Sequence, residues 1–240
     1  MKAKVFTLSL VFIIGTQGFA QISENLRFGF TVTPQVSWLG SDDKTVKYDK
    51  PQTGLTVGTT AEWYLNENYI LTSGLGLTFG RGGTIEHEIG GRLLPDAELS
   101  SPLYDTLPDN SKLKYDIQYL EIPIGFRMRS REFGRFRLTF EAPIITFGIK
   151  IKAKADIEAP GLETTTEENI SSEVNLFNMS YGFGAGTEYT LTENISILLM
   201  LQYTQGFLDV TKDHGVLRNG NFEDSKGTIG HFALKTAVLF

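Results

Sequence analysis

The feature that most constrains this chain is an alternation of bulky apolar with small or polar residues, repeated along eight long runs. Alternation with period 2 is typical of β-strands whose two faces differ. Most runs are 11 to 18 residues long, whereas soluble strands are usually about 5–6 residues and membrane-spanning strands need about 9–11. The expected strands cover residues 26–38, 54–64, 69–80, 114–130, 135–152, 174–189, 195–207 and 229–240.

The connections between these runs alternate in length. Residues 65–68, 131–134 and 190–194 are typical of tight turns. The other connections are long and rich in Asp, Glu, Gly, Ser and Asn, and they cover residues 39–53, 81–113, 153–173 and 208–228. An antiparallel meander then has all tight turns at one end and all long loops at the other, as outer-membrane barrels do. The sequence therefore predicts an all-β fold, an eight-stranded antiparallel up-and-down transmembrane β-barrel.

The two faces of each run indicate which one meets lipid. In the last run Phe232, Leu234 and Val238 share one face, and Ala233 and Ala237 lie on the other. Because the interior of an eight-stranded barrel is just wide enough for side chains to fill, the small face suits the inside and the bulky face suits lipid. The alternative is a soluble lipocalin-like barrel with the bulky face inside.

Aromatic residues gather near both ends of the runs, as the two interfacial girdles of a membrane barrel do. Those near the tight turns are Trp63, Tyr64, Tyr69, Phe136, Tyr189 and Phe240, and those near the long loops are Trp38, Phe79, Phe147, Phe177, Phe207 and Phe232. Pro34, Pro123 and Pro143 interrupt strands and predict β-bulges. The parity of apolar residues changes at Pro143, so one extra residue is expected there.

Both ends of the chain carry targeting signals. Residues 1–20 have a short basic start, an apolar core at 5–14 and small residues before Gln21, which is the pattern of a cleaved signal peptide. The barrel domain is then 21–240. The final strand ends at Phe240 and resembles the signal read by the barrel-assembly machinery. The expected location is the cell outer membrane, with both termini on the periplasmic side and outer-membrane lipid around the barrel.

Several function classes have no support. The chain has no cysteine, and its 22 Lys and Arg against 28 Asp and Glu give a net charge of −6, so nucleic acid is not an expected partner. No HExxH, GxSxG or P-loop pattern occurs, and the glycine-rich segment 182–186 lies in a strand with no helix after it. His87 and His214 are expected in solvated loops. We therefore expect no enzyme, and no catalytic, cofactor-binding or metal-binding residues are assigned.

Strand parity directs a set of charged residues into the barrel. They are Glu62, Glu121, Glu141, Glu188, Arg27, Arg127, Arg129, Arg137, Lys150 and Lys235. Buried charges have to pair, because an isolated ion away from water is very unfavourable. The set predicts a structural ion-pair core, and a narrow gated ion path is the alternative. Glu121 and Glu141 could suggest a catalytic carboxylate pair, but the neighbouring arginines would keep both ionised.

Five sequence segments carry a resemblance to a known family. The segments are AEWYL (61–65), YLEIPI (119–124), KAKA (152–155), GAGTEY (184–189) and QGFLDV (205–210). Together they resemble the PorT family of outer-membrane barrels from Bacteroidota-type bacteria. The resemblance implies a structural or accessory role in type IX protein secretion, with secretion-system components as partners, and it transfers no active-site residue.

Three functions are therefore carried forward. The first is a non-enzymatic, PorT-like structural or accessory protein of the outer membrane. The second is a small porin, which the crowded charged interior disfavours. The third is a surface adhesin or receptor that acts through the long loops, with 81–113 as the best candidate for contact.

Overall fold

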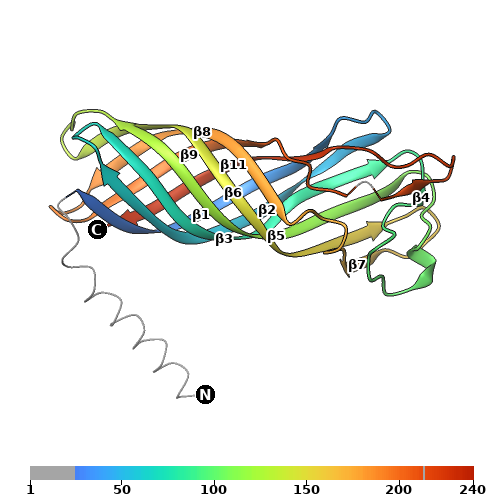
Figure 1. The fold of residues 1–240 in the computed structure, drawn as a ribbon. Coiled ribbons are helices and arrows are strands. Elements are labelled where there is room, and N and C mark those ends of the chain that lie inside the picture. Colours follow the sequence, from blue (N-terminus) through green and yellow to red (C-terminus); the bar gives the residue numbers. More distant parts are fainter. Residues whose placement is uncertain (1–24, 213) are drawn as a thin grey trace, which may run out of the picture.

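The structure is a computed structural model that describes residues 25–212 and 214–240. The expected signal peptide, residues 1–20, lies outside the described residues. Within the described ranges, eight long antiparallel strands form one closed barrel (Figure 1). They are β1 (Leu26–Ser41), β2 (Val46–Tyr64), β3 (Tyr69–His87), β5 (Ser111–Arg129), β6 (Phe136–Glu158), β8 (Phe177–Thr190), β9 (Ser196–Gly206) and β11 (Gly227–Leu239). Each pairs with the next long strand, and β1 pairs with β11 to close the ring. The predicted fold class is confirmed.

The short connections gather at one end of the barrel. In the turn between β2 and β3, Oδ1 of Asn66 accepts hydrogen bonds from the backbone N–H groups of Asn68 and Tyr69 at 2.9 and 3.0 Å, which is an Asx turn. At the same end, the backbones of Phe28 and Phe240 exchange hydrogen bonds of 3.2 and 2.9 Å. The barrel therefore has a short-turn end, which holds the C-terminus, and a loop end (Figure 1).

Shorter elements lie at the loop end (Figure 1). β4 (Gly91–Arg92) and β10 (Val216–Leu217) pair as a small sheet, β7 (Thr165–Asn169) adds to β6, and η1 (Pro102–Tyr104) is one helical turn. No helix in the described part of the chain is long and apolar enough to cross a membrane.

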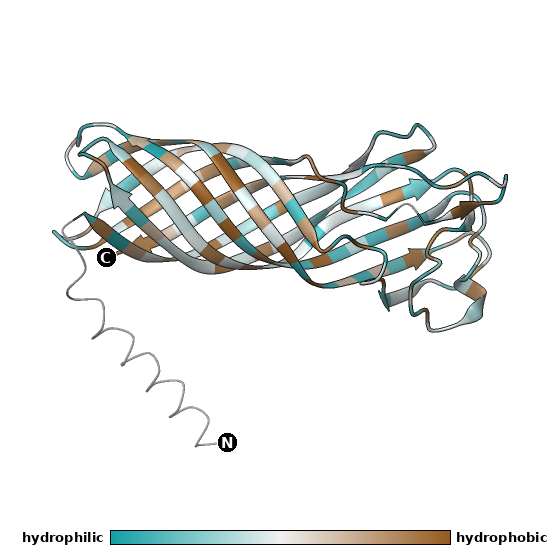
Figure 2. Ribbon diagram, in the orientation of Figure 1, coloured by the Kyte–Doolittle hydropathy of each residue, from teal (hydrophilic) through white to brown (hydrophobic). Residues whose placement is uncertain are grey.

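The outward face of the barrel wall is an apolar band, and Figure 2 shows its hydrophobic positions along the strands. On β11, Phe232, Leu234 and Val238 are exposed, while Ala233 and Ala237 are buried. The exposed large side chains of the wall include Phe30, Val32, Val36, Leu55, Leu71, Leu75, Leu77, Phe79, Ile122, Ile124, Leu138, Phe140, Ile145, Phe147, Ile149, Tyr181, Phe183, Leu199 and Leu201. The bulky face thus points outward, as predicted, and the lipocalin-like alternative is wrong.

The bulge expected at Pro143 is present, whereas the bulges expected at Pro34 and Pro123 are not, because the strand registers run past both residues without a shift. The register of β6 with β8 shifts between Glu141 and Ile144. Before the shift Phe140 points outward, and after it Ile145 does. The extra residue keeps both apolar stretches of the strand on the lipid side.

The predicted loops are shorter than expected, because several strands continue past the apolar band. Most of 39–53 is strand, and so are the beginning of 81–113 and of 153–173. In these extensions the two faces exchange character: on β5, Leu113 and Ile117 are buried inside, while Lys114 and Asp116 face outward. A strand surrounded by water has its apolar face inside, so the exchange marks the edge of the apolar band.

The extensions and their connections form one folded unit, here called the cap. The cap comprises residues 39–53, 80–118, 152–176, 207–212 and 214–229. Its inward-facing strand residues Ile85, Leu113 and Ile157 belong to the same buried apolar cluster as Leu107 and Val210 from the connections. The cap therefore has a hydrophobic core of the kind found in soluble domains, and this core fills the loop end of the barrel.

Candidate functional site

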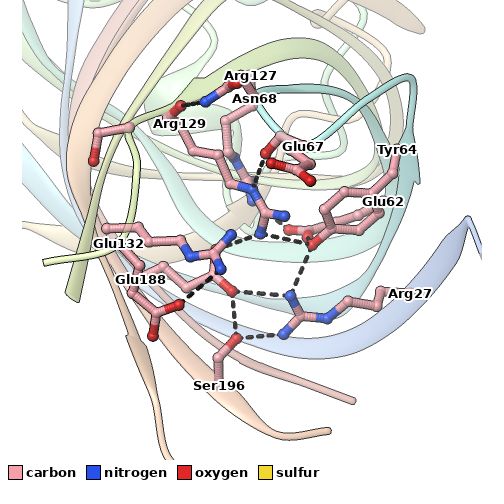
Figure 3. A network of polar contacts seen from close by, with 12 residues as sticks. Arg27, Glu62, Tyr64, Glu67, Asn68, Arg127, Arg129, Glu132, Glu188 and Ser196 are labelled. Atoms are coloured by element: carbon pink, nitrogen blue, oxygen red, sulfur yellow. Dashed lines mark hydrogen bonds and ion pairs between the residues drawn. The ribbon is translucent and has the colours of Figure 1, made fainter. Parts of the chain in front are cut away.

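The lumen carries the charged residues, and they lie in three layers. The layer at the short-turn end is centred on Arg27, which donates to Oη of Tyr64 at 2.7 Å and to Glu188 at 2.9 Å and also contacts Ser196 (Figure 3). Arg129 lies 3.6 Å from the other oxygen of Glu188, and its guanidinium lies over the Tyr64 ring, 4.5 Å from the centroid. Tyr64 thus points into the barrel, and its assignment to the aromatic girdle is wrong.

The middle layer is the most deeply buried. Arg127 on β5 is fully buried and bridges the carboxylates of Glu62 and Glu141. Thr72 donates to the remaining oxygen of Glu141 at 2.6 Å. A Cβ atom on Gly125 would lie 2.3 Å from that same oxygen, so glycine makes room for the ion pair. The small inner face predicted from the sequence therefore accommodates the charges.

The layer nearest the cap depends on a residue that strand parity missed. Arg81 lies 2.9 Å from Glu121, and it donates to Nδ1 of His231 at 2.5 Å. Glu121 also accepts from Thr78 at 2.8 Å. Arg81 falls in the predicted loop 81–113 and follows Gly80, whose φ of +70° breaks the alternation. The one sequence signal that could have identified Arg81 as a lumen residue is its charge within the run of glycines at 80–83.

The predicted ion-pair core is confirmed for most of the set, with three corrections. Lys235 lines the cavity beside the middle layer but takes part in none of the salt bridges there. Arg137 pairs with Glu132 in the turn beside it at 2.9 Å, and a quarter of its side chain is exposed. Lys150 bonds to the backbone carbonyl oxygens of Ser171 and Val174 in the cap. Neither residue belongs to the buried layers. Arg137 lies beside the turn at the start of β6. Lys150 lies on β6 close to the edge of the apolar band, where its side chain reaches the cap. Both residues therefore find partners outside the buried layers.

The candidate catalytic and metal residues do not form a reactive group. Glu121 and Glu141 lie in different layers, and each has its own arginine. His87 is buried at the end of β3 rather than solvated, which corrects the expectation. His214 is exposed and lies 3.0 Å from Asp96. Among the described residues, no group of three or more metal-ligating side chains is assembled.

A polar cavity of about 80 Å³ lies between the middle layer and the layer nearest the cap. Its walls include Thr31, Gln35, Arg81, His231 and Lys235. The middle ion-paired layer lies on its short-turn side, and the pair of Arg81 with Glu121 and the apolar core of the cap lie on its other side. The lumen therefore contains a polar cavity, with salt bridges at one level and aliphatic side chains of the cap at another.

Comparisons with known proteins give a family and a set of similar structures. The sequence model of the family described as "Outer membrane protein beta-barrel domain" matches residues 19–212. No curated protein matches the sequence. The structure is similar to Neisserial surface protein A (9% identity, 90% of this chain and 98% of that chain, TM-score 0.42). It is also similar to Ail of Yersinia pestis (14%, 91% and 100%, 0.38) and to OprG of Pseudomonas aeruginosa (12%, 90% and 94%, 0.41).

Proposed function

The chain belongs to the outer membrane protein beta-barrel domain family, and from this premise we propose that it is a sealed, non-enzymatic barrel that acts through its cap. The protein lies in the cell outer membrane, where the apolar band meets lipid. The proposed role is that of a structural or accessory component that holds a folded surface outside the bilayer. The single observation that carries the proposal is the hydrophobic core of the cap, which closes the lumen and makes the cap a folded unit.

The interior favours sealing over conduction. A channel needs a continuous aqueous path, and porins with such a path have about 16–18 strands. Here the lumen holds Arg127 with its two carboxylates at one level, and Leu113 and Ile157 of the cap core at another. Moving an ion past these layers would break buried ion pairs or enter an apolar core, and both are strongly unfavourable.

The cap is held together by specific polar contacts as well as by its core. Glu168 on β7 accepts a hydrogen bond from the backbone N–H of Ser100 at 2.8 Å. Nδ2 of Asn175 donates to the carbonyl oxygens of Asp209 and Thr211 at 3.1 and 2.8 Å. These bonds join connections that are far apart in the sequence. A preorganised surface loses little conformational entropy when a partner binds, which suits a binding role.

The partner proposed first is a component of the protein-secretion machinery. The support is the resemblance of segments such as 119–124 and 184–189 to the PorT family. The second candidate, surface adhesion, is favoured by two large apolar side chains that the cap leaves in solvent. Leu103 is 68% exposed and Phe222 is 75% exposed, so both side chains are accessible to a partner.

Two experiments test the proposal. Single-protein recordings in planar bilayers should show no steady conductance, and an open aqueous pore would overturn the sealed-barrel proposal. A deletion strain should lose export of secreted proteins and regain it with the wild-type chain. The double variant Leu103→Ser, Phe222→Ser, made at normal levels, separates the two partner classes: normal secretion with lost cell adhesion would replace the secretion role by the adhesin role.

A further inference from the structure

One of the three short turns of the barrel differs from the other two in charge. The hairpin between β5 and β6, residues 130–137 and here called the arginine turn, contains three arginines and one glutamate. The turns at 65–68 and 190–194 contain one glutamate each and no basic residue. The arginine turn therefore carries a local charge of +2 (three positive, one negative), whereas each of the other two short turns carries −1.

Two arginines of this turn have no counter-charge from the protein. Arg137 and Glu132 form an ion pair of 2.9 Å and neutralise each other. Arg131 and Arg135 are exposed. Among the described residues, neither guanidinium forms an ion pair or a hydrogen bond, and the glutamates of the other two turns do not reach them. The excess positive charge of the turn therefore lies on these two side chains.

The same turn carries exposed apolar side chains that continue the lipid-facing surface. The backbone N–H of Phe133 donates to the carbonyl oxygen of Phe136 at 2.8 Å, and the N–H of Phe136 donates back at 3.2 Å. Directly paired residues project from the same face of a hairpin. Phe133, Phe136 and Leu138 are 65%, 51% and 63% exposed. The outward apolar stripe of β6 therefore extends to the tip of the turn.

Unpaired arginines beside exposed aromatic rings suit the headgroup level of a bilayer. Aromatic side chains are enriched at the membrane–water interface, and arginine lays its apolar stem along such a surface while its charged group reaches outward. A guanidinium binds a phosphate group through two parallel hydrogen bonds. The arginine turn offers two such groups, Arg131 and Arg135, directly beyond the apolar band.

We propose that the arginine turn binds the headgroup of an anionic phospholipid in the leaflet at the short-turn end. Arg131 and Arg135 contact the phosphate, and Phe133 packs against the glycerol and the first methylene groups of the acyl chains. The continuity of Phe133 with the apolar band favours a lipid over a partner in the aqueous phase. This site is separate from the cap, because the two lie at opposite ends of the barrel (Figure 1).

The test measures lipid preference around the full-length mature protein, refolded into phosphatidylcholine bilayers. Electron spin resonance compares the association of spin-labelled phosphatidylglycerol and spin-labelled phosphatidylcholine with the barrel. The wild-type protein should prefer phosphatidylglycerol, and the double variant Arg131→Gln, Arg135→Gln should lose most of this preference. The matched control Arg92→Gln, Arg218→Gln removes two exposed arginines from the cap and should keep it. Equal preference in the wild type and the arginine-turn variant would overturn the proposal.

Two further measurements distinguish a lipid from a free phosphate group. Inorganic phosphate should reduce the preference of the wild-type protein no more than chloride does at equal ionic strength, because both salts screen the charges alike and neither contacts Phe133. A larger loss in phosphate would show that the turn takes phosphate without the lipid and would overturn the lipid assignment. Phe133→Ser should weaken the preference for phosphatidylglycerol. An unchanged preference in this variant would contradict the packing of the ring against the lipid.

Discussion

Arg127 on β5 and Glu141 on β6 are register partners, and Arg127 donates from both Nε and Nη2 to the same carboxylate oxygen, at 3.0 and 2.8 Å. The other oxygen of Glu141 accepts from Thr72, so the carboxylate is fully engaged. The third guanidinium nitrogen of Arg127, Nη1, donates a hydrogen bond to the carboxylate of Glu62. The three charges form a closed group at the most buried level of the barrel, and this predicts where the lumen is most sensitive to mutation.

Arg127→Met should strongly destabilise the barrel, because it leaves the carboxylates of Glu62 and Glu141 buried without a counter-charge. Breaking a buried pair in this way costs about 3–5 kcal/mol. Arg137→Met is the matched control, since its partner Glu132 lies in the turn and is partly exposed, and it should cost about 1 kcal/mol or less. Urea unfolding in detergent micelles measures both variants. Equal midpoints would show that the middle layer does not hold the barrel together.

A charge on the lipid side should destabilise the folded state in a bilayer. Leu199 on β9 and Phe183 on β8 point outward from the apolar band. Leu199→Arg or Phe183→Arg should cost about 2–4 kcal/mol near the midplane. The control is Leu103→Arg, an equally drastic change at an exposed position of the cap, which should leave stability almost unchanged. A wild-type protein that stays folded and monodisperse without detergent would contradict the prediction.

Acid should loosen the cap through His87. Only 4% of this residue is exposed, and burial lowers its pKa from 6.5 to about 4. Neither ring nitrogen has a hydrogen-bond partner among the described residues. Since the unfolded segment takes up a proton at a higher pH than the folded one, the contribution of His87 to stability is full above about pH 6.5 and falls as the pH drops toward 4.

Hydrogen exchange of cap amides at pH 7.5 and pH 4.5 measures this effect. After correction for the intrinsic pH dependence of amide exchange, the amides of the wild-type cap should exchange faster at pH 4.5 than at pH 7.5. His87→Phe should remove most of the difference, because phenylalanine fills the ring's place without titrating. His214→Phe, at an exposed position, should behave like the wild type. A pH response that persists in His87→Phe would assign the effect to other groups.

Deletion of Phe240 should impair assembly far more than stability. Its ring lies on the outer surface, 5.8 Å from that of Phe30, and almost half of the residue is exposed. Little packing is lost without it, so the refolding yield in micelles should be close to normal. If the terminal aromatic is read by the assembly machinery, the outer-membrane level in cells should fall severalfold. Wild-type levels of the truncated protein in the outer membrane would refute the targeting role.

Strand parity predicted the barrel wall well, because a single physical rule holds there. Inside the apolar band, an outward residue meets lipid and an inward residue meets a narrow lumen, so Phe232 and Ala233 fall on opposite faces, as predicted. The parity change at Pro143 revealed the bulge for the same reason. Register and face were therefore readable from local sequence.

The cap could not be predicted in this way, because the rule reverses outside the bilayer. On β5, Ile122 points outward within the band, whereas Ile117 points inward in the cap. A run whose apolar residues move from the outward face to the inward face is interpreted as a loop when only outward apolar residues are expected. The glycines near Arg81 added to this effect, since Gly80 and Gly82 both have positive φ. Contacts between distant connections, such as Glu168 with Ser100, leave no local pattern.

The reversal of polarity along the strands also fixes how deep the barrel sits. On β6, Ile151 is exposed beside lipid-facing residues, and Lys152, paired in register with Gln118, follows it directly. Sinking the barrel by about two residues, or roughly 7 Å, would carry Lys152 into hydrocarbon, and raising it by the same amount would put Ile151 into water. The boundary between the apolar band and the cap therefore fixes the depth at which the barrel sits in the membrane. Whatever docks on the tip of the cap therefore meets it at a constant height above the membrane.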